Sequence, residues 1–195
     1  TYVACLDSLG ALFAAGEMED LGRCARSMVR RNPALLGPLV TRARRLVATR
    51  PDQSAALVLA ASSAVRDDAG FLDEASQILR QAGRAEESTI LLGRSLGARA
   101  AEAFALGLDS KALKLAGQAA ERDPSPAHFL MVARAAARLG ERDAAVESIG
   151  AAVASGPVDA DEIRRDPVLA TLFPNRRLED VLDRAARRTG ENRTK

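Results

Sequence analysis

A block of sequence that occurs twice, 33 residues apart, most constrains what this chain can fold into. The pair Leu106-Gly107 returns as Leu139-Gly140, and Pro124 returns as Pro157. Small residues follow the same interval: Ala100, Ala103, Ala112 and Ala119 are matched by Ala133, Ala136, Ala145 and Ala152. A fixed period of this length is typical of proteins in which helical units stack on their neighbours. The repeat therefore favours a binding function over catalysis.

Helical periodicity runs through the chain, and no segment has a convincing strand pattern. The apolar share of 47% comes largely from Ala and Leu, while aromatic residues make up only 3% and Trp is absent. Alanine favours helix and fills little volume, so a core of this composition requires helices that approach closely. The sequence therefore predicts an all-α fold.

The spacing of small residues places the turns between helices at positions 16, 51, 83, 107 and 140. Glycine at such a turn permits the left-handed backbone that ends one helix. A small residue five positions later lets two antiparallel helices approach closely, and Ala112, Ala145 and, in a weaker match, Ser88 take this position. Proline 17 positions after the turn, as at Pro124 and Pro157, is expected at a first helical position.

Two further features define the expected helices. Asn32, Ser125 and Asp166 each precede a proline and are predicted helix N-caps. The turns at 83 and 107 are only 24 residues apart. This short interval predicts either a first helix shortened to about 98–106 or one continuous helix from 86 onward.

This pattern resembles the tetratricopeptide repeat family, whose unit is a helix–turn–helix of about 34 residues. In the best-matching unit, Ala133, Ala145, Ala152 and Pro157 take the family's small and proline positions, and Phe129 stands where the family often has Trp. The resemblance implies a right-handed α-solenoid of about five antiparallel helix pairs over residues 1–157. The expected units are about 2–34, 35–68, 69–97, 98–125 and 126–157.

After the last repeat, residues 158–189 are predicted to form C-terminal capping helices, and the segment resembles the tail that closes many bacterial arrays of this family. We expect a short helix at 159–165, a turn at 167–172 and an amphipathic helix at 178–188. Such a cap covers the last apolar face of the array. Residues 190–195 are expected to be a frayed tail.

Patterns that carry catalysis or bind metals are absent from the sequence. The chain has one histidine, no Cys-x-x-Cys or His-Glu-x-x-His spacing and no phosphate-binding glycine loop. Acidic clusters stand at predicted helix starts, where they complement the helix dipole. We therefore predict a protein that is not an enzyme and has no catalytic residue, metal site or cofactor, with His128 at the surface or the edge of a groove.

Cysteine content and hydropathy bear on the compartment. Cys5 and Cys24 are expected to be buried, reduced thiols on two successive packed helices, with a disulfide possible in a secreted context. No run of 18 apolar residues exists, so the sequence predicts no membrane span. A cytoplasmic location is expected, although the chain begins without Met and a targeting segment could be missing.

Charge is unevenly distributed, although the net charge of +2 is nearly balanced. The segment 21–51 contains eight arginines and no acidic residue. These are Arg23, Arg26, Arg30, Arg31, Arg42, Arg44, Arg45 and Arg50. They form either a solvated face that pairs with acids of neighbouring units, or an electropositive patch for an acidic peptide, an acidic protein surface or a phosphate backbone. The segment lacks the aromatic residues on which single-stranded nucleic acid stacks, which disfavours the phosphate backbone.

The family resemblance also implies a binding groove on the concave face, lined by the first helix of each pair. The matching positions are Leu6, Gly10 and Phe13 in the first unit, Thr41 and Arg45 in the second, Asp73, Gln77 and Arg80 in the third, and Leu130 and Arg134 in the fifth. Arginine on successive units suits an acidic peptide or one ending in a carboxylate. Alternatively, these arginines only solvate the groove. Asparagines that match those of the family's chaperone-binding subset are lacking, which disfavours that subset.

The sequence therefore favours a non-enzymatic scaffold, part of a longer bacterial polypeptide, that binds a protein or an acidic peptide through the groove and the arginine-rich face. The expected contact residues are Thr41, Arg42, Arg44, Arg45, Asp73, Gln77, Arg80 and Arg134. One alternative is a nucleic-acid-binding repeat protein that uses the basic segment from Arg23 to Arg50. Another is a self-association module that forms homo-oligomers.

Overpacking tests the predicted helix spacing. Replacing Ala145 by Leu is expected to lower the free energy of unfolding by about 1–3 kcal/mol, because the larger side chain forces a tight helix pair apart. Thermal or urea unfolding measures the effect. An unfolding midpoint equal to that of the parent protein would show that the turn positions are wrongly assigned.

Overall fold

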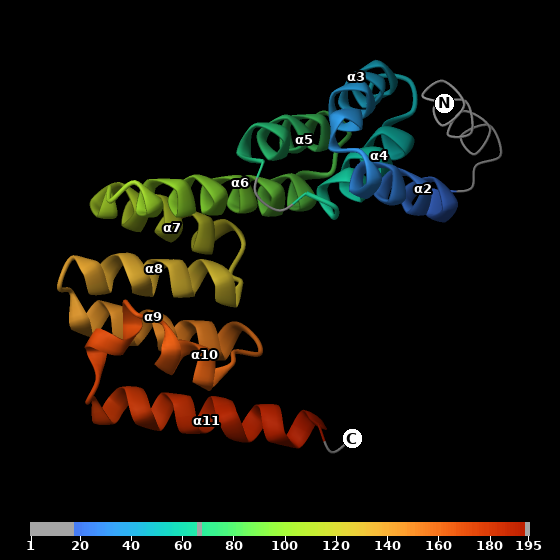
Figure 1. Ribbon diagram of the computed structural model, residues 1–195. Coiled ribbons are helices and arrows are strands. Elements are labelled where there is room, and N and C mark those ends of the chain that lie inside the picture. The colour runs from blue at the N-terminus through green and yellow to red at the C-terminus, as the bar shows by residue number, and fades with distance from the viewer. Residues whose placement is uncertain (1–17, 66–67, 194–195) are drawn as a thin grey trace. The chain divides into compact units, whose positions relative to one another are not determined.

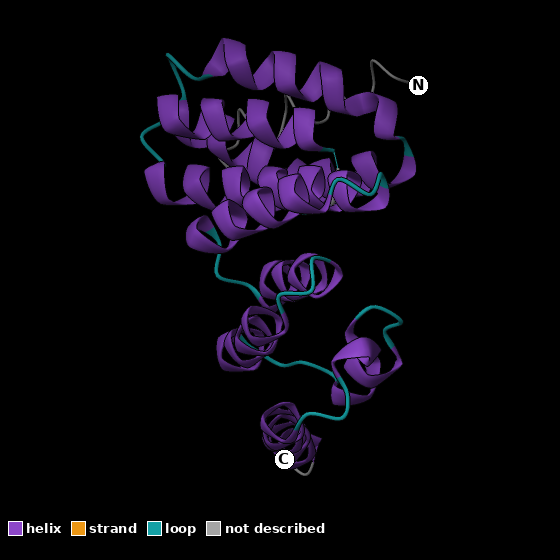
Figure 2. Ribbon diagram, turned by 90° about the vertical axis from the view of Figure 1, so that its left-hand side faces the viewer, coloured by secondary structure: helices purple, strands orange, loops and turns teal. Residues whose placement is uncertain are grey.

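A computed structural model describes residues 18–65 and 68–193 of the chain, and in them the protein is helical without strands (Figure 1), which confirms the all-α prediction. Figure 2 shows the same helices joined by short loops. By its internal contacts the chain divides into two compact units, residues 1–95 and 96–195. The predicted turn at 16, the groove positions Leu6, Gly10 and Phe13, and Cys5 lie outside the described residues.

The first unit is built from helices that pack on their neighbours along the chain. Its elements are α2 (Met18–Arg31), the 3₁₀ turn η1 (Pro33–Leu35), α3 (Leu36–Leu46), α4 (Pro51–Ser62), α5 (Ala69–Gln81) and the first half of α6 (Ala85–Ala105). Helices α2 and α3 both pack against α4, and α5 packs against α3 and α4. Leu39, Leu57, Leu72 and Leu79 are fully buried in the core between them.

Buried serines join the antiparallel pair α5 and α6. The Ser88 hydroxyl donates to the carbonyl of Ser76 (2.8 Å), the Ser76 hydroxyl donates to the carbonyl of Ser88 (3.0 Å), and both side chains are buried. Ser88 is the residue five positions after the turn glycine. A hydroxymethyl group is small enough for close helix approach, and the helix backbones satisfy its polar group. Ser88, the weaker sequence match, therefore has the same structural role as Ala112 and Ala145 after the other turns.

The second unit continues the series of packed helices and ends in the segment of α10, η2 and α11, which we call the cap. After the second half of α6 come α7 (Asp109–Arg122), α8 (Pro126–Arg138), α9 (Arg142–Ser155), α10 (Ala160–Arg165), the 3₁₀ turn η2 (Leu169–Leu172) and α11 (Arg176–Arg193). Helix α8 packs against α7 and α9, and α11 packs against α9. Ala112, Ala145 and Ala152 have no exposed surface, as their repeated positions predict. Leu178 and Leu182 of α11 are buried in the same core, which is what a capping helix requires.

Turn glycines adopt the predicted left-handed backbone. Gly83, Gly107 and Gly140 have φ angles of 79°, 75° and 80°, and every described residue with positive φ is a glycine. The predicted turn at 51 has no glycine: position 51 is Pro51, the first residue of α4. Any side chain at these three glycines would be strained. The repeated Gly is therefore a consequence of the backbone that each turn requires.

The structure decides three predictions about where helices begin and end. Helix α6 is continuous from Ala85 to Ala105, so the second of the two alternatives for this stretch is correct. Pro33 does begin a 3₁₀ turn, but Pro124 and Pro157 lie in connecting segments before the next helix, and a first helical position is wrong for both. The last helix extends beyond the predicted range 178–188 and ends at Arg193.

Asn32 and Ser125 take the predicted N-cap positions, of η1 and α8, whereas Asp166 ends α10 and Val168 is the N-cap of η2. The Asn32 side chain accepts a hydrogen bond from the amide of Ala34 (3.2 Å). The Asp166 carboxylate accepts from the amides of Val168 (2.9 Å) and Leu169 (3.1 Å). Ser125 caps no helix amide, because its hydroxyl lies 3.1 Å from Nδ1 of His128.

His128 is buried, so the expected surface position is wrong. Its Nδ1 also lies 2.7 Å from the carbonyl oxygen of Asp123. On the other side, the imidazole lies directly against the backbone of α6 at Gly97, where a Cβ atom would stand 2.5 Å from Nε2. The missing side chain of Gly97 creates the space for the ring, a relation between distant residues that the local sequence does not reveal.

Glycine-to-alanine substitutions are expected to have opposite effects at different helix positions. Gly117 and Gly150 lie inside α7 and α9, and a Cβ atom there meets nothing within 4 Å. Alanine at either position is expected to raise the free energy of unfolding by about 0.5–1 kcal/mol through helix propensity. Alanine at Gly97 is expected to lower it by about 1–3 kcal/mol, because the buried ring of His128 must move.

Urea unfolding of the three single variants measures the free energy of unfolding, which is expected to rise for Gly117→Ala and Gly150→Ala and to fall for Gly97→Ala. A stabilising Gly97→Ala variant would contradict the placement of His128 on α6.

Candidate binding surface

One face of α3 lines a hollow of about 660 Å³ in the first unit. We call it the α3 hollow, and its described lining is Gly37, Pro38, Thr41, Arg42, Arg45 and Leu46. Residues at intervals of four lie on the same side of a helix, so this lining is a single helical face. Leu39, Val40 and Ala43 are buried, and they hold α3 in the core. The structure thus brings together Thr41, Arg42 and Arg45, three of the predicted contact residues.

The α3 hollow combines positive charge with an apolar wall. Arg45 is exposed, and no carboxylate of the described residues lies within ion-pair distance of it. Arg42 is half-buried beside it, and the Thr41 hydroxyl donates to the carbonyl of Gly37 (2.9 Å). Guanidinium groups present paired N–H donors that match a carboxylate. The hollow is therefore suited to an acidic group that is attached to an apolar chain.

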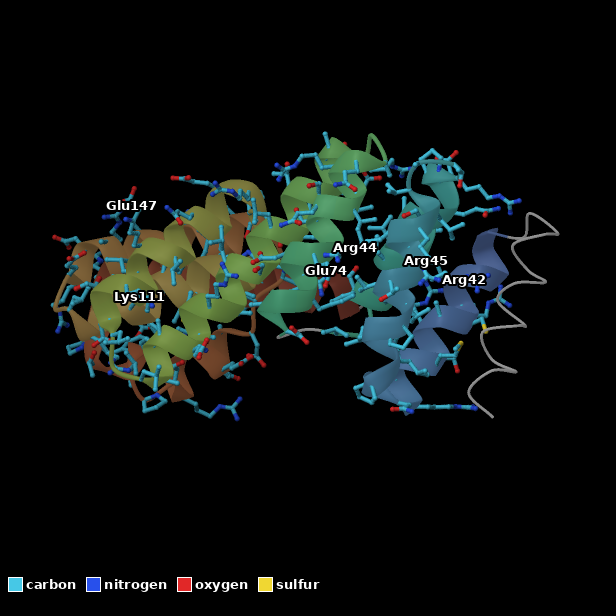
Figure 3. All side chains as sticks on the ribbon, turned by 90° about the horizontal axis from the view of Figure 1, so that it is seen from above. Arg42, Arg44, Arg45, Glu74, Lys111 and Glu147 are labelled. Carbon is cyan, nitrogen blue, oxygen red and sulfur yellow. The ribbon has the colours of Figure 1, made fainter. Side chains whose placement is uncertain are left out.

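Arg44 lies on a different side of α3 and contacts α5. Its guanidinium forms an ion pair with Glu74 (2.5 Å), and Figure 3 shows the two side chains between their helices. An exposed pair of this kind contributes little to stability. For Arg44, the alternative that the basic segment pairs with acids of a neighbouring unit is correct.

The basic segment also covers α2. Arg23, Arg26 and Arg30 are exposed along this helix, as their spacing predicts. Within the part of the chain that the structure describes, Arg26 and Arg30 make no ion pair with a carboxylate. Helices α2 and α3 both pack on α4, so both basic helices belong to the same unit.

The contact residues predicted on α5 separate into two kinds. Asp73 is half-buried and accepts a hydrogen bond from the Ser95 hydroxyl of α6 (2.6 Å), so it contributes to helix packing. Gln77 and Arg80 are exposed, and the side chain of neither makes a hydrogen bond or ion pair with another described residue. Gln77 and Arg80 are thus available to a partner, and Asp73 has a structural contact.

The groove positions predicted on α8 are engaged within the second unit. Nε of Arg134 donates to the Asp166 carboxylate (2.6 Å), which joins α8 to the C-terminal cap. Leu130 is half-buried and packs against the core of this unit. Burial by itself raises the pKa of Asp166, but the hydrogen bonds from Arg134 and from the amides of Leu169 and Val168 outweigh it and lower the pKa overall.

Two arginine side chains make hydrogen bonds to distant backbone carbonyls that the sequence did not predict. Nη2 of Arg94 on α6 donates to the carbonyl oxygens of Ser62 and Val65, each at 2.8 Å, and so satisfies the end of α4. Nη2 of Arg142 on α9 donates to the carbonyl of Leu172 in the cap (2.9 Å). Because both contacts join residues about 30 positions apart, neighbouring residues in the sequence do not indicate them.

Among the described residues, no group of three or more His, Cys, Asp or Glu side chains is arranged to hold a metal ion. No helix in the described ranges is long and apolar enough to cross a membrane. Comparisons with protein-family models, curated proteins and solved structures found no significant match.

Acid titration tests the link between α8 and the cap. Because the pKa of Asp166 is lower in the folded protein than in the unfolded chain, its charge stabilises the fold above about pH 4. This contribution is lost as the pH falls through the folded-state pKa. An Asp166→Asn variant is therefore expected to be less stable than the parent at neutral pH, and the difference is expected to shrink in acid.

Urea unfolding at a series of pH values measures this difference, with Asp180→Asn on the exposed side of α11 as the control substitution. A stability difference that is independent of pH would show that the carboxylate charge of Asp166 has no such role.

Proposed function

We propose that the protein is a non-enzymatic helical-repeat scaffold of the tetratricopeptide type, which binds an acidic segment of a partner protein at the α3 hollow. The observation that carries the proposal is the pair Arg42 and Arg45 beside the apolar Pro38 and Leu46 in one open hollow. The expected contact set is Thr41, Arg42 and Arg45, extended by Gln77 and Arg80 on α5. The predicted cytoplasmic location is part of this proposal.

The charge of the hollow favours an acidic ligand over a neutral one. Arg45 has no described carboxylate within ion-pair distance, so an incoming carboxylate need not displace an existing ion pair from it. Such contacts raise the association rate and discriminate between partners more than they raise affinity. We therefore expect moderate affinity that decreases as salt concentration rises.

A protein ligand fits the surface better than a nucleic acid does. Both offer negative charge, but no aromatic residue occurs between residues 18 and 50 for bases to stack on. The apolar wall formed by Pro38 and Leu46 suits aliphatic side chains. The nucleic-acid alternative predicts a steep dependence of affinity on salt, set by the number of phosphates neutralised.

Charge reversal within the hollow tests the proposal. An Arg42→Glu/Arg45→Glu variant is expected to bind a fluorescein-labelled Glu- and Leu-rich peptide at least about tenfold more weakly than the parent, because attraction becomes repulsion. Fluorescence anisotropy measures the affinity, and circular dichroism verifies that the helical content is unchanged. A labelled single-stranded oligonucleotide of equal charge is titrated in parallel.

The control is the swapped pair Arg44→Glu/Glu74→Arg, which keeps the ion pair and the net charge of this face. This variant is expected to bind the peptide like the parent. Equal affinity of the parent and the Arg42→Glu/Arg45→Glu variant would remove the α3 hollow as the binding site. Tighter binding of the oligonucleotide than of the peptide would instead favour the nucleic-acid alternative.

A further inference from the structure

The second unit exposes apolar side chains at two consecutive turns. Among the described residues, four large hydrophobic side chains are exposed, and three of them are Leu106 (68%), Leu108 (47%) and Leu139 (38%). Leu106 and Leu108 flank the turn glycine between α6 and α7, and Leu139 precedes the turn glycine between α8 and α9. Single exposed leucines are common, but several gathered in one place indicate a contact surface.

Arg138 at the end of α8 holds the two turns together. Its Nη1 donates to the carbonyl of Phe104 (3.0 Å), its Nε pairs with the Asp109 carboxylate (3.1 Å), and its guanidinium lies 4.3 Å from the centre of the Phe104 ring. These contacts place the end of α8 against both ends of the α6–α7 turn. The three leucines therefore belong to one edge of the second unit, which we call the turn edge.

A hollow of about 570 Å³ opens at the same edge. Its described lining comes from the end of α8, the start of α9 and the cap segment before and within η2. These residues are Ala137, Arg138, Gly140, Arg142, Pro167, Val168 and Thr171. The hollow thus adjoins Leu139 directly through its chain neighbours Arg138 and Gly140.

The charge of this hollow is positive. Asp109 balances the charge of Arg138. Arg142 is exposed, uses one N–H for the carbonyl of Leu172 and has no described carboxylate within ion-pair distance. The exposed Glu141 and Asp143 flank it in the sequence but are not among the residues that line the hollow. One guanidinium with unused N–H donors therefore faces the hollow beside a group of leucines.

We propose that the turn edge is a second docking surface, for a partner segment that carries a carboxylate side chain next to bulky apolar side chains. The carboxylate binds Arg142 in the hollow, and the apolar side chains cover Leu106, Leu108 and Leu139. Charge complementarity selects an acidic residue over a basic one, and the leucines select an apolar neighbour. This site belongs to the second unit and does not depend on the α3 hollow.

Selection of peptides from an unbiased library tests the proposal without a known partner. Random peptides displayed on phage are selected against the full chain, and the enriched sequences are synthesised and titrated by anisotropy. We expect a group of enriched peptides that share Asp or Glu next to Leu, Ile, Met or Phe. Their affinity is expected to fall at least about tenfold for Arg142→Gln and for Leu106→Ser/Leu139→Ser.

Two control variants make the result specific to the turn edge. Lys114→Gln removes an exposed cation farther along α7 from the turn glycine, one that makes no ion pair with a described residue, and it is expected to leave the affinity unchanged. Arg142→Lys keeps both the charge and a donor toward Leu172, and it is expected to restore most of the binding lost in Arg142→Gln. Restoration separates the role of the charge from any structural effect of the lost hydrogen bond.

Four outcomes would overturn the proposal. One is that selection enriches no peptide. Another is that all enriched peptides bind the Arg142→Gln and leucine variants like the parent. A third is that the enriched peptides lose affinity only for Arg42→Glu/Arg45→Glu, which would support the α3 hollow instead. The fourth is a concentration-dependent dimer in light scattering that the leucine variant abolishes, which would assign this edge to a second copy of the chain.

Discussion

Close contact between antiparallel helices is the constraint on which the rest of this structure depends. The core contains few aromatic side chains, so its helices must approach until alanine and serine fill the space between them. The residue five positions after each of three turn glycines meets this requirement: Ser88, Ala112 and Ala145 are all buried. These positions of close contact leave little room for larger side chains, and the longer polar residues lie at the surface, where a partner can contact them.

Much of this fold could be predicted because its causes are local. The left-handed turns at Gly83, Gly107 and Gly140 and the hydrogen bonds that the Asn32 and Asp166 side chains accept from nearby amides each depend on residues within a few positions of one another. Periodicity likewise locates the buried face of each helix. These features repeat along the chain, and the repetition made them recognisable.

The features that the sequence did not predict depend on distant partners. His128 is buried because α6 has no side chain at Gly97, and no local pattern links these two positions. Arg134 was predicted to line the groove, yet its guanidinium forms an ion pair with Asp166 in the cap. The same reasoning explains the candidate sites: the spacing of Thr41, Arg42 and Arg45 was visible in the sequence, whereas the pairing of Arg44 with Glu74 was not.

Among the described residues, two classes of arginine differ in what they contact. One class, which includes Arg94, Arg134 and Arg138, holds helix ends, turns or the cap through backbone carbonyls and half-buried carboxylates. The other class, which includes Arg26, Arg30 and Arg45, is exposed and has no described carboxylate partner. Since the second class contributes little to the fold, we infer that its charges serve binding.

The most direct test of this division compares the free energy of unfolding of two alanine variants. Arg94→Ala leaves the carbonyls of Ser62 and Val65 without their donor and is expected to cost about 1–3 kcal/mol. Arg45→Ala is expected to change stability by less than about 0.5 kcal/mol, as exposed substitutions usually do. That difference would establish that Arg45 is available for a partner. An equal loss in both variants would show that the basic face is part of the fold, and it would contradict the account.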